Sequence, residues 1–189
     1  AEVRFLRALA YHHLAMCYRD APLITVPQTL ENANIPKNTN KELVDFVISE
    51  LNAITTGTEL SVAPQQGRVS KGAAMALLAR FYLYTQKYTE AAETAKKVMD
   101  LGAYNLSTAY PALFKTTGET SKDVIFAVQY AGPGLAAGVG AIFNGYFPAA
   151  PQVHTVALPN LADDYYCTDG LPITKSPLYS VQNKHLNRD

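Results

Sequence analysis

Residues 67–102 constrain the fold more than any other stretch, because they predict two helices joined by a very short turn. Apolar side chains cover more than half of the circumference of the first helix, which is typical of a helix buried on several sides. The second helix has an apolar face at helical spacing, made of Ala91, Ala92, Ala95, Val98 and Met99. We expect Ser70 to cap the first helix and Gly102 to end the second in the left-handed conformation.

This helical pair has the large, small and aromatic positions of one tetratricopeptide repeat (TPR). Leu78, Ala79 and Tyr82 fill these positions in the first helix, and Tyr88 and Ala91 fill the corresponding positions around the second. A repeat of this kind buries its faces only against stacked neighbours. The pattern therefore predicts an α-solenoid core but no particular function.

Two more helices are predicted before this pair. Residues 2–18 have a broad apolar face, made of Phe5, Leu6, Leu9, His13, Leu14 and Cys17. Residues 39–56 begin with the Thr39–Glu42 pattern of a capping box. We therefore expect a mainly α fold of antiparallel, TPR-like helical hairpins, in which residues 2–18 pair with 39–56 and residues 70–86 pair with 89–101.

The second half of the chain has a different composition. Residues 123–130, DVIFAVQY, are rich in β-branched and aromatic side chains and predict a strand, and residues 153–158 predict a second short strand. The chain is thus expected to divide into a TPR-like helical core, residues 1–105, and a loop-rich region with one or two short strands, residues 106–189. We expect this second region to be incomplete at its C-terminus.

The charge balance excludes several classes of function. The 189 residues carry 16 basic and 16 acidic side chains, which argues against the basic face that nucleic-acid binding needs. No apolar run reaches the length of a transmembrane helix. Cys17 and Cys167 are expected to be small buried hydrophobes rather than a disulfide framework.

The sequence has no strong motif for catalysis or for cofactor binding. The adjacent His12 and His13 point about 100° apart on a helix, so they cannot chelate one metal ion together. Glycines at 132, 134 and 138 resemble a dinucleotide-binding spacing, but the glycines and prolines that follow do not build the helix such a site needs. We expect no enzyme, no cofactor and no metal, and a hydrolase with distant carboxylates is the remaining enzymatic alternative.

Several blocks of the chain, in the same order, resemble the SusD/RagB family of outer-membrane nutrient-binding lipoproteins. The blocks are residues 1–18, APLIT at 21–25, GRVSKGAAMALLARFYL at 67–83, VIFAVQ at 124–129, Asp163-x-Tyr165 with Asp169-Gly170-x-Pro172-Ile173, SPLY at 176–179 and NRD at 187–189. Arg19 departs from the pattern, because the family usually has glycine after the first helix. The family's members are also much longer than this chain.

The resemblance implies a non-catalytic, cell-surface glycan-binding protein used in polysaccharide utilization by Bacteroidetes. Such a protein captures oligosaccharides and delivers them to a SusC-like, TonB-dependent transporter in the outer membrane. It would lie on the extracellular face of the outer membrane, held there only by an N-terminal lipid anchor that this chain lacks. The alternative is a TPR-like scaffold that binds other proteins and has no direct affinity for sugars.

Glycan capture requires aromatic faces against the apolar face of a sugar ring, together with planar polar groups for its hydroxyls. The chain has no tryptophan, so tyrosine or phenylalanine must supply these faces. The candidates in irregular segments are Tyr146, Phe147, Tyr165 and Tyr166.

Overall fold

The computed structural model describes residues 1–115, 118–129 and 158–188, apart from the side chain of Asn32. The chain divides into two compact units, Ala1–Gln129 and Tyr130–Asp189. Residues 106–129 lie in the first of these units, so the division falls well beyond residue 105. The predicted domain boundary at residue 105 stays a prediction, since compact packing alone does not define independently folding domains.

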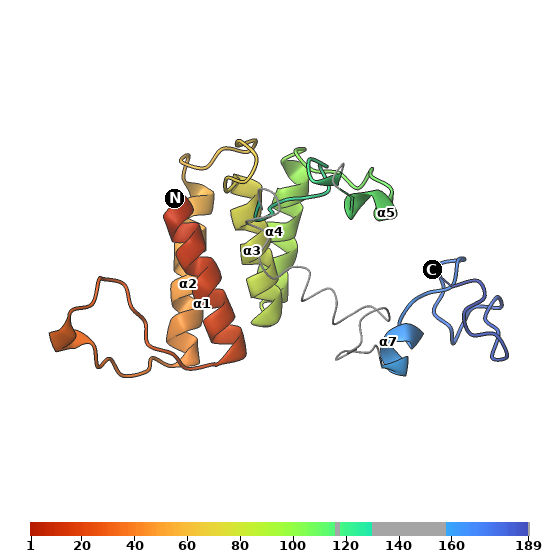
Figure 1. Cartoon of the computed structure of the whole chain (residues 1–189), viewed down its shortest axis with the longest axis horizontal. Helices are drawn as coiled ribbons and strands as arrows, with labels where there is room; N and C mark the ends of the chain where they lie inside the picture. Colours follow the sequence, from red (N-terminus) through yellow and green to blue (C-terminus); the bar gives the residue numbers. More distant parts are fainter. Residues whose placement is uncertain (116–117, 130–157, 189) are drawn as a thin grey trace. The chain divides into compact units, whose positions relative to one another are not determined.

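Four long helices form the first unit (Figure 1). They are α1 (Glu2–Cys17), α2 (Asn40–Thr56), α3 (Lys71–Tyr84) and α4 (Tyr88–Asp100). Each helix packs on the next one along the chain, and α1 also contacts α3. A 3₁₀ turn, η1 (Leu30–Asn32), and a short helix, α5 (Tyr110–Leu113), lie in the connections. The mainly α fold with antiparallel hairpins is thus confirmed.

The helix ends follow the capping chemistry of the sequence. The Thr39 side chain accepts a hydrogen bond from the Glu42 amide, and the Glu42 carboxylate accepts one from the Thr39 amide at 2.7 Å. Ser70 Oγ accepts a hydrogen bond from the Ala73 amide at 2.9 Å. Gly102 has φ +63°, the left-handed conformation that ends many helices at a glycine. These three caps were readable from the sequence because they depend on local chemistry alone.

The long connection between α1 and α2 is closed at its base, so the two helices run antiparallel. Ala21 and Asn38 form an isolated antiparallel bridge. The Asp20 carboxylate accepts a hydrogen bond from the Asn40 amide at 2.8 Å, next to the start of α2. Arg19 has φ +62°, so this corner uses the left-handed conformation although a non-glycine residue occupies it.

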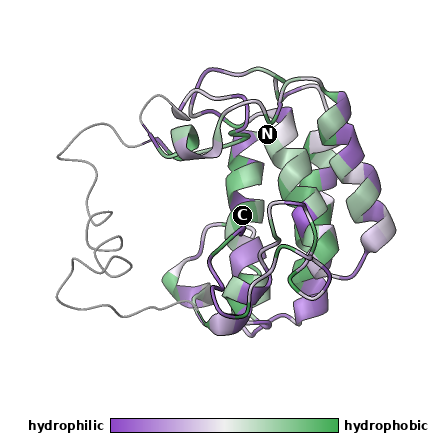
Figure 2. Ribbon diagram, turned by 90° about the vertical axis from the view of Figure 1, so that its right-hand side faces the viewer, coloured by the Kyte–Doolittle hydropathy of each residue, from purple (hydrophilic) through white to green (hydrophobic). Residues whose placement is uncertain are grey.

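The core lies between the four helices, and its fully buried side chains include Phe81, Leu43, Leu51, Ile54 and Val47. Figure 2 shows both hydrophobic and hydrophilic segments along the helices, as expected for helices that bury one face. No helix within the described ranges has both the length and the hydrophobicity needed to cross a lipid bilayer.

The buried faces of α1 and α4 differ from the predicted ones. In α1 the buried residues are Phe5, Ala8, Tyr11, His12 and Ala15, whereas Leu6, His13 and Cys17 are exposed. In α4 the buried residues are Ala91, Thr94 and Val98, and Ala92, Ala95 and Met99 are exposed. Small alanine side chains at the helix–helix contacts let the helices approach closely. In α1, the buried face is therefore the one that carries these alanines, and not the one that carries the longer leucines. The burial predicted for Cys17 is therefore wrong, while Cys167 is buried as predicted.

The strand predicted over residues 123–130 is wrong for its described part. Residues 126–129 are assigned to no strand or helix, and the described residues contain only isolated bridges. A strand needs a partner for its backbone groups. Here Ile125 and Phe126 instead pack against the helical core, and the Phe126 ring meets the Phe5 ring edge-on at 5.3 Å between centroids. Residues 153–157 of the second predicted strand lie outside the described residues.

His12 is a buried polar residue in this core. It is 6% exposed, and neither ring nitrogen has a hydrogen-bond partner among the described residues. Its ring lies 5.2 Å from that of Phe81 and stacks on that of Tyr84 at 6.1 Å. Burial lowers the pKa of His12 below its usual range, and the charges of His13 and Arg80 lower it further.

Replacing His12 with phenylalanine is expected to raise the free energy of unfolding by about 1–2 kcal/mol, because two unpaired buried nitrogens are removed. In the wild type, the unfolded chain takes up a proton on this residue more readily than the folded one. Stability should therefore fall as the pH drops below the unfolded pKa of about 6.5, and this dependence should be weaker in the variant.

Urea titrations between pH 5 and 8 measure both effects. The exposed neighbour provides the control, since His13→Phe should leave most of the pH dependence in place: burial, the largest cause of the lowered pKa of His12, is unchanged. An unchanged pH dependence in His12→Phe would contradict the assignment.

Candidate functional site

The second unit is organised by hydrogen bonds between its sequence motifs. The Asp169 carboxylate accepts from the Leu171 amide at 3.1 Å and from Ser176 Oγ at 2.8 Å. Gly170 has φ +75°, which only glycine adopts without strain. The Asn187 side chain donates to the Leu178 carbonyl at 3.1 Å. The Asp-Gly, Ser-Pro and Asn-Arg motifs therefore form one frame.

Arg188 lies at the end of this frame and faces α7 (Pro159–Asp163). An antiparallel bridge links it to the buried Cys167. One guanidinium nitrogen of Arg188 donates to the Ala162 carbonyl, and the guanidinium lies 5.9 Å from the centroid of the Tyr179 ring. Its Nε has no hydrogen-bond partner within the described part of the chain. The arginine is thus held in place and keeps one donor unused.

A pocket of about 440 Å³ lies beside α7 within this unit. It is lined by Pro159, Leu161, Ala162, Asp163, Tyr165, Lys184, His185 and Arg188. The lining combines an aromatic ring, an acceptor carboxylate and cationic donors. This is the combination that a sugar ring uses, because its C–H face packs on an aromatic ring and its hydroxyls bond to planar polar groups.

The four predicted ligand residues have different positions. Tyr165 lines this pocket and is 58% exposed. Tyr166 is 53% exposed but is not part of the pocket lining. Tyr146 and Phe147 lie outside the described residues. No group of three or more His, Cys, Asp or Glu side chains in the described ranges could hold a metal ion.

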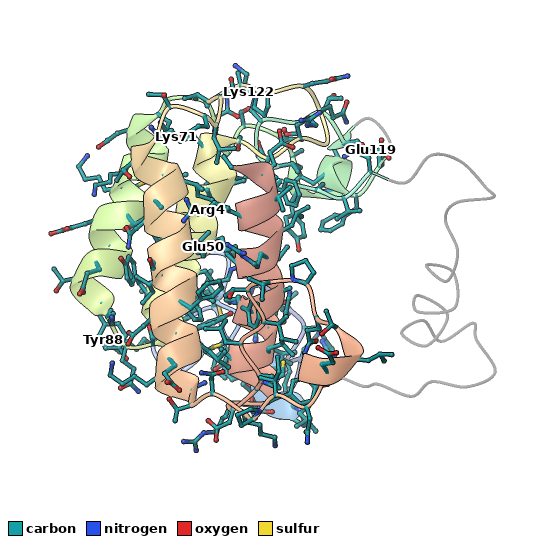
Figure 3. All side chains as sticks on the ribbon, turned by 90° about the vertical axis from the view of Figure 1, so that its left-hand side faces the viewer. Arg4, Glu50, Lys71, Tyr88, Glu119 and Lys122 are labelled. Carbon is teal, nitrogen blue, oxygen red and sulfur yellow. The ribbon has the colours of Figure 1, made fainter. Side chains whose placement is uncertain are left out.

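Sequence reasoning missed a second pocket, which lies in the helical unit at the start of α3. Its volume is about 260 Å³. Its lining comes from three segments, residues 62–70, 103–104 and 119–129. In Figure 3, Lys71, the first residue of α3, lies at the same end of the unit as Lys122 and Glu119.

Two glycines of the GRVSKG stretch shape this second pocket. A Cβ atom at Gly72 would lie 2.3 Å from the Tyr104 hydroxyl, so only glycine leaves room for this ring. Gly67 has φ +81°, and a Cβ atom there would lie 3.1 Å from the Gln129 side chain. The sequence shows the two glycines, but it does not predict which distant residues pack against them.

Comparisons with known proteins agree with this architecture. Residues 1–83 match the SusD-like family described as "Starch-binding associating with outer membrane". The chain is 28% identical over 134 residues to SusD-like protein P25 of Formosa agariphila, covering 69% of this chain and 25% of that protein. It is 32% identical over 131 residues to the starch-binding protein SusD of Bacteroides thetaiotaomicron, covering 66% of this chain and 23% of that protein.

Solved structures extend the similarity to the whole chain. A SusD-like carbohydrate-binding protein from Bacteroides fragilis matches with a TM-score of 0.78 and 27% identity, covering 100% of this chain and 38% of that one. A laminarin-binding SusD-like protein matches with a TM-score of 0.60 and 29% identity, covering 66% of this chain and 29% of that one. The chain spans about a quarter of the length of the curated relatives that it matches. The family model, the curated relatives and the solved structures thus agree that the chain is similar to SusD-like proteins.

Proposed function

We propose that the protein containing this chain is a non-catalytic glycan receptor that captures oligosaccharides at the cell surface. The observation that carries the proposal is the match, over the whole chain, to a SusD-like carbohydrate-binding protein. The names of the relatives refer to starch and laminarin, so glucans are the first ligands to test. We further propose that a lipid anchor holds the protein on the extracellular face of the outer membrane, and that it delivers its ligand to a SusC-like TonB-dependent transporter.

A binding screen tests the receptor function. Purified full-length protein would be run in native gels that contain starch, laminarin or other soluble polysaccharides. Retarded migration in at least one gel is the expected result. Chromatography of the polysaccharide after incubation should show its original length. Shortened products would favour the hydrolase alternative, and unretarded migration of folded protein in every gel would contradict glycan capture.

Within the described residues, Tyr165 is the stronger candidate for stacking on a sugar ring, since it lines a pocket that also holds Asp163 and Arg188. Tyr166 is proposed as a neighbouring contact because half of its surface is exposed. Tyr146 and Phe147 remain part of the proposal on sequence grounds alone.

Replacing Tyr165 with alanine is expected to weaken glycan binding by about two- to twelvefold, as loss of one aromatic stacking contact costs about 0.5–1.5 kcal/mol. Titration calorimetry of the full-length protein would measure the dissociation constant. Tyr18→Ala, at a tyrosine that is 73% exposed in the helical unit, is the matched control and should not change it. If alanine at Tyr146, Phe147, Tyr165 and Tyr166 together left the affinity unchanged, the proposed contacts would be wrong.

A protein-binding scaffold is the second candidate function, and one observation favours it. Tyr88, Ala92, Ala95 and Met99 form an exposed apolar stripe along α4, at the i, i+4, i+7 and i+11 positions of one helix face. Figure 3 shows Tyr88 at the outer side of the unit. If the protein is a scaffold, it should retain the transporter in a pull-down experiment. It should also show no measurable affinity for any glycan.

A further inference from the structure

The pocket at the start of α3 has the features of a small-molecule site that neither the sequence motifs nor the relatives' names assign. We propose that it binds one neutral sugar ring, as a subsite separate from the Tyr165 pocket. This inference rests on the proposed glycan-binding function and names a second place where that function is carried out.

A rigid aromatic ring forms one side of this pocket. The Tyr104 ring packs directly against the backbone of Gly72, and its hydroxyl lies 2.8 Å from Ser70 Oγ. Ser70 Oγ also accepts the hydrogen bond of the Ala73 amide, and Ser70 is only 3% exposed. The ring is therefore held at its hydroxyl end. Such an ordered ring can receive a ligand without losing further side-chain freedom.

The hydroxyl pair also keeps a hydrogen-bonding group for a ligand. Ser70 and Tyr104 together carry two hydroxyl protons, and the bond between them uses one. The other proton can be donated to a ligand oxygen. A sugar hydroxyl is a suitable partner, because it accepts this proton and donates its own in turn.

Two linked side-chain amides lie on another side of the pocket. Gln66 Nε2 donates to Gln129 Oε1 at 3.2 Å, and the Gln129 side chain lies against Gly67. The bond leaves Gln66 Oε1 as an acceptor and Gln129 Nε2 as a donor, with each amide held by the other. A donor and an acceptor side by side match the adjacent hydroxyls of a sugar ring.

The charges around the pocket favour a neutral ligand over an anion. Arg68 is neutralised by Glu2, to which it donates hydrogen bonds of 2.7 and 2.8 Å. These bonds also hold the pKa of the Glu2 carboxyl below its usual range. Lys122 and Glu119 in the lining carry opposite charges. The volume of about 260 Å³ lies just below the usual range of ligand pockets, about 300–1,000 Å³, and suits a single ring.

The test uses the full-length protein and a panel of trisaccharides, maltotriose and laminaritriose among them. Dissociation constants would be measured by calorimetry for the wild type, for Gln66→Ala with Gln129→Ala, and for Ala127→Phe, which fills the pocket from its lining. The matched control is Ala92→Phe, the same change at an exposed position of α4. Unchanged thermal unfolding would show that each variant is folded. If Ala127→Phe does not fold, the double glutamine variant still tests whether the pocket binds the sugar.

We expect both pocket variants to bind at least one trisaccharide about tenfold more weakly and the control to bind as the wild type does. In a variant that combines Ala127→Phe with Tyr165→Ala, each site should lose the affinity that it loses in the corresponding single variant, because the two sites are distinct. Wild-type affinity in both pocket variants, with glycan binding otherwise intact, would overturn this inference and leave the proposed function standing. A wild-type protein that binds no glycan would overturn both.

Discussion

Replacing Arg4 and Arg7 together with methionine is expected to destabilise the helical unit by about 3–5 kcal/mol, because it leaves a buried carboxylate without a partner. Glu50 of α2 has a side chain that is only 8% exposed, and both of its oxygens accept hydrogen bonds from α1. Arg4 donates to Oε1 at 2.7 and 3.2 Å, and Arg7 donates to Oε2 with Nε at 3.1 Å. Figure 3 shows Arg4 and Glu50 facing each other across the two helices.

The charge state of Glu50 gives this prediction a pH dependence. Burial raises the pKa of the Glu50 carboxyl, but the hydrogen bonds from Arg4 and Arg7 outweigh burial and hold the pKa below its usual range. The carboxylate therefore contributes its full stability above the unfolded pKa of about 4.3, and this contribution is lost as the pH falls through the lower folded value. In the arginine-free variant this acid-dependent loss should disappear.

Urea unfolding of the wild type and the variants, followed by circular dichroism, measures the difference. Lys41→Met removes an exposed ion pair with Asp45 and should cost about 0.5 kcal/mol or less. Adding Glu50→Met to the double arginine variant should recover most of the lost stability, since no buried charge then remains. A double variant as stable as the wild type would show that Glu50 is not held by these arginines.

Replacing Phe81 with alanine is the second large expected effect, a loss of about 3–5 kcal/mol. Phe81 is completely buried in α3, and its ring lies 5.2 Å from that of His12 in α1. The cavity would lie where α3 contacts α1, in a closely packed core that cannot easily collapse to fill it.

The matched control for Phe81 is a neighbouring position on the same helix. Leu83 is 51% exposed, so Leu83→Ala should cost less than about 1 kcal/mol. Both variants would be compared by urea unfolding. Similar losses at the two positions would mean that α3 does not bury the face that the structure assigns to it.

Local chemistry explains why the helices were predictable. Thr39, Ser70 and Gly102 cap helices through groups within three residues of themselves, so the sequence alone predicts where the helices begin and end. The faces of the helices depend on their neighbours. Ala8 and Ala15 lie inside in α1 because small side chains permit close packing, and Leu6 is left outside although it is more hydrophobic.

Long-range contacts explain what the sequence could not predict. A glutamate such as Glu50 is normally expected at the surface of a helix. Its burial is possible only because it contacts an arginine of α1 that lies more than 40 positions away in the sequence. Gly72 reads as a weak point in a helix, and only the packing of Tyr104 shows why glycine is required there. Residues from separate segments of the chain line each of the two pockets. Tyr165 was proposed from its position in a loop, whereas Tyr104 and Gln129 were not predicted from the sequence.

Calorimetric titration of the full-length protein with a polysaccharide that retards it in native gels tests the central claim most directly. The glycan would be recovered afterwards and its length measured. The receptor account predicts saturable binding that Tyr165→Ala weakens, with the glycan recovered intact. Absence of heat with every polysaccharide, or recovery of shortened chains, would contradict it.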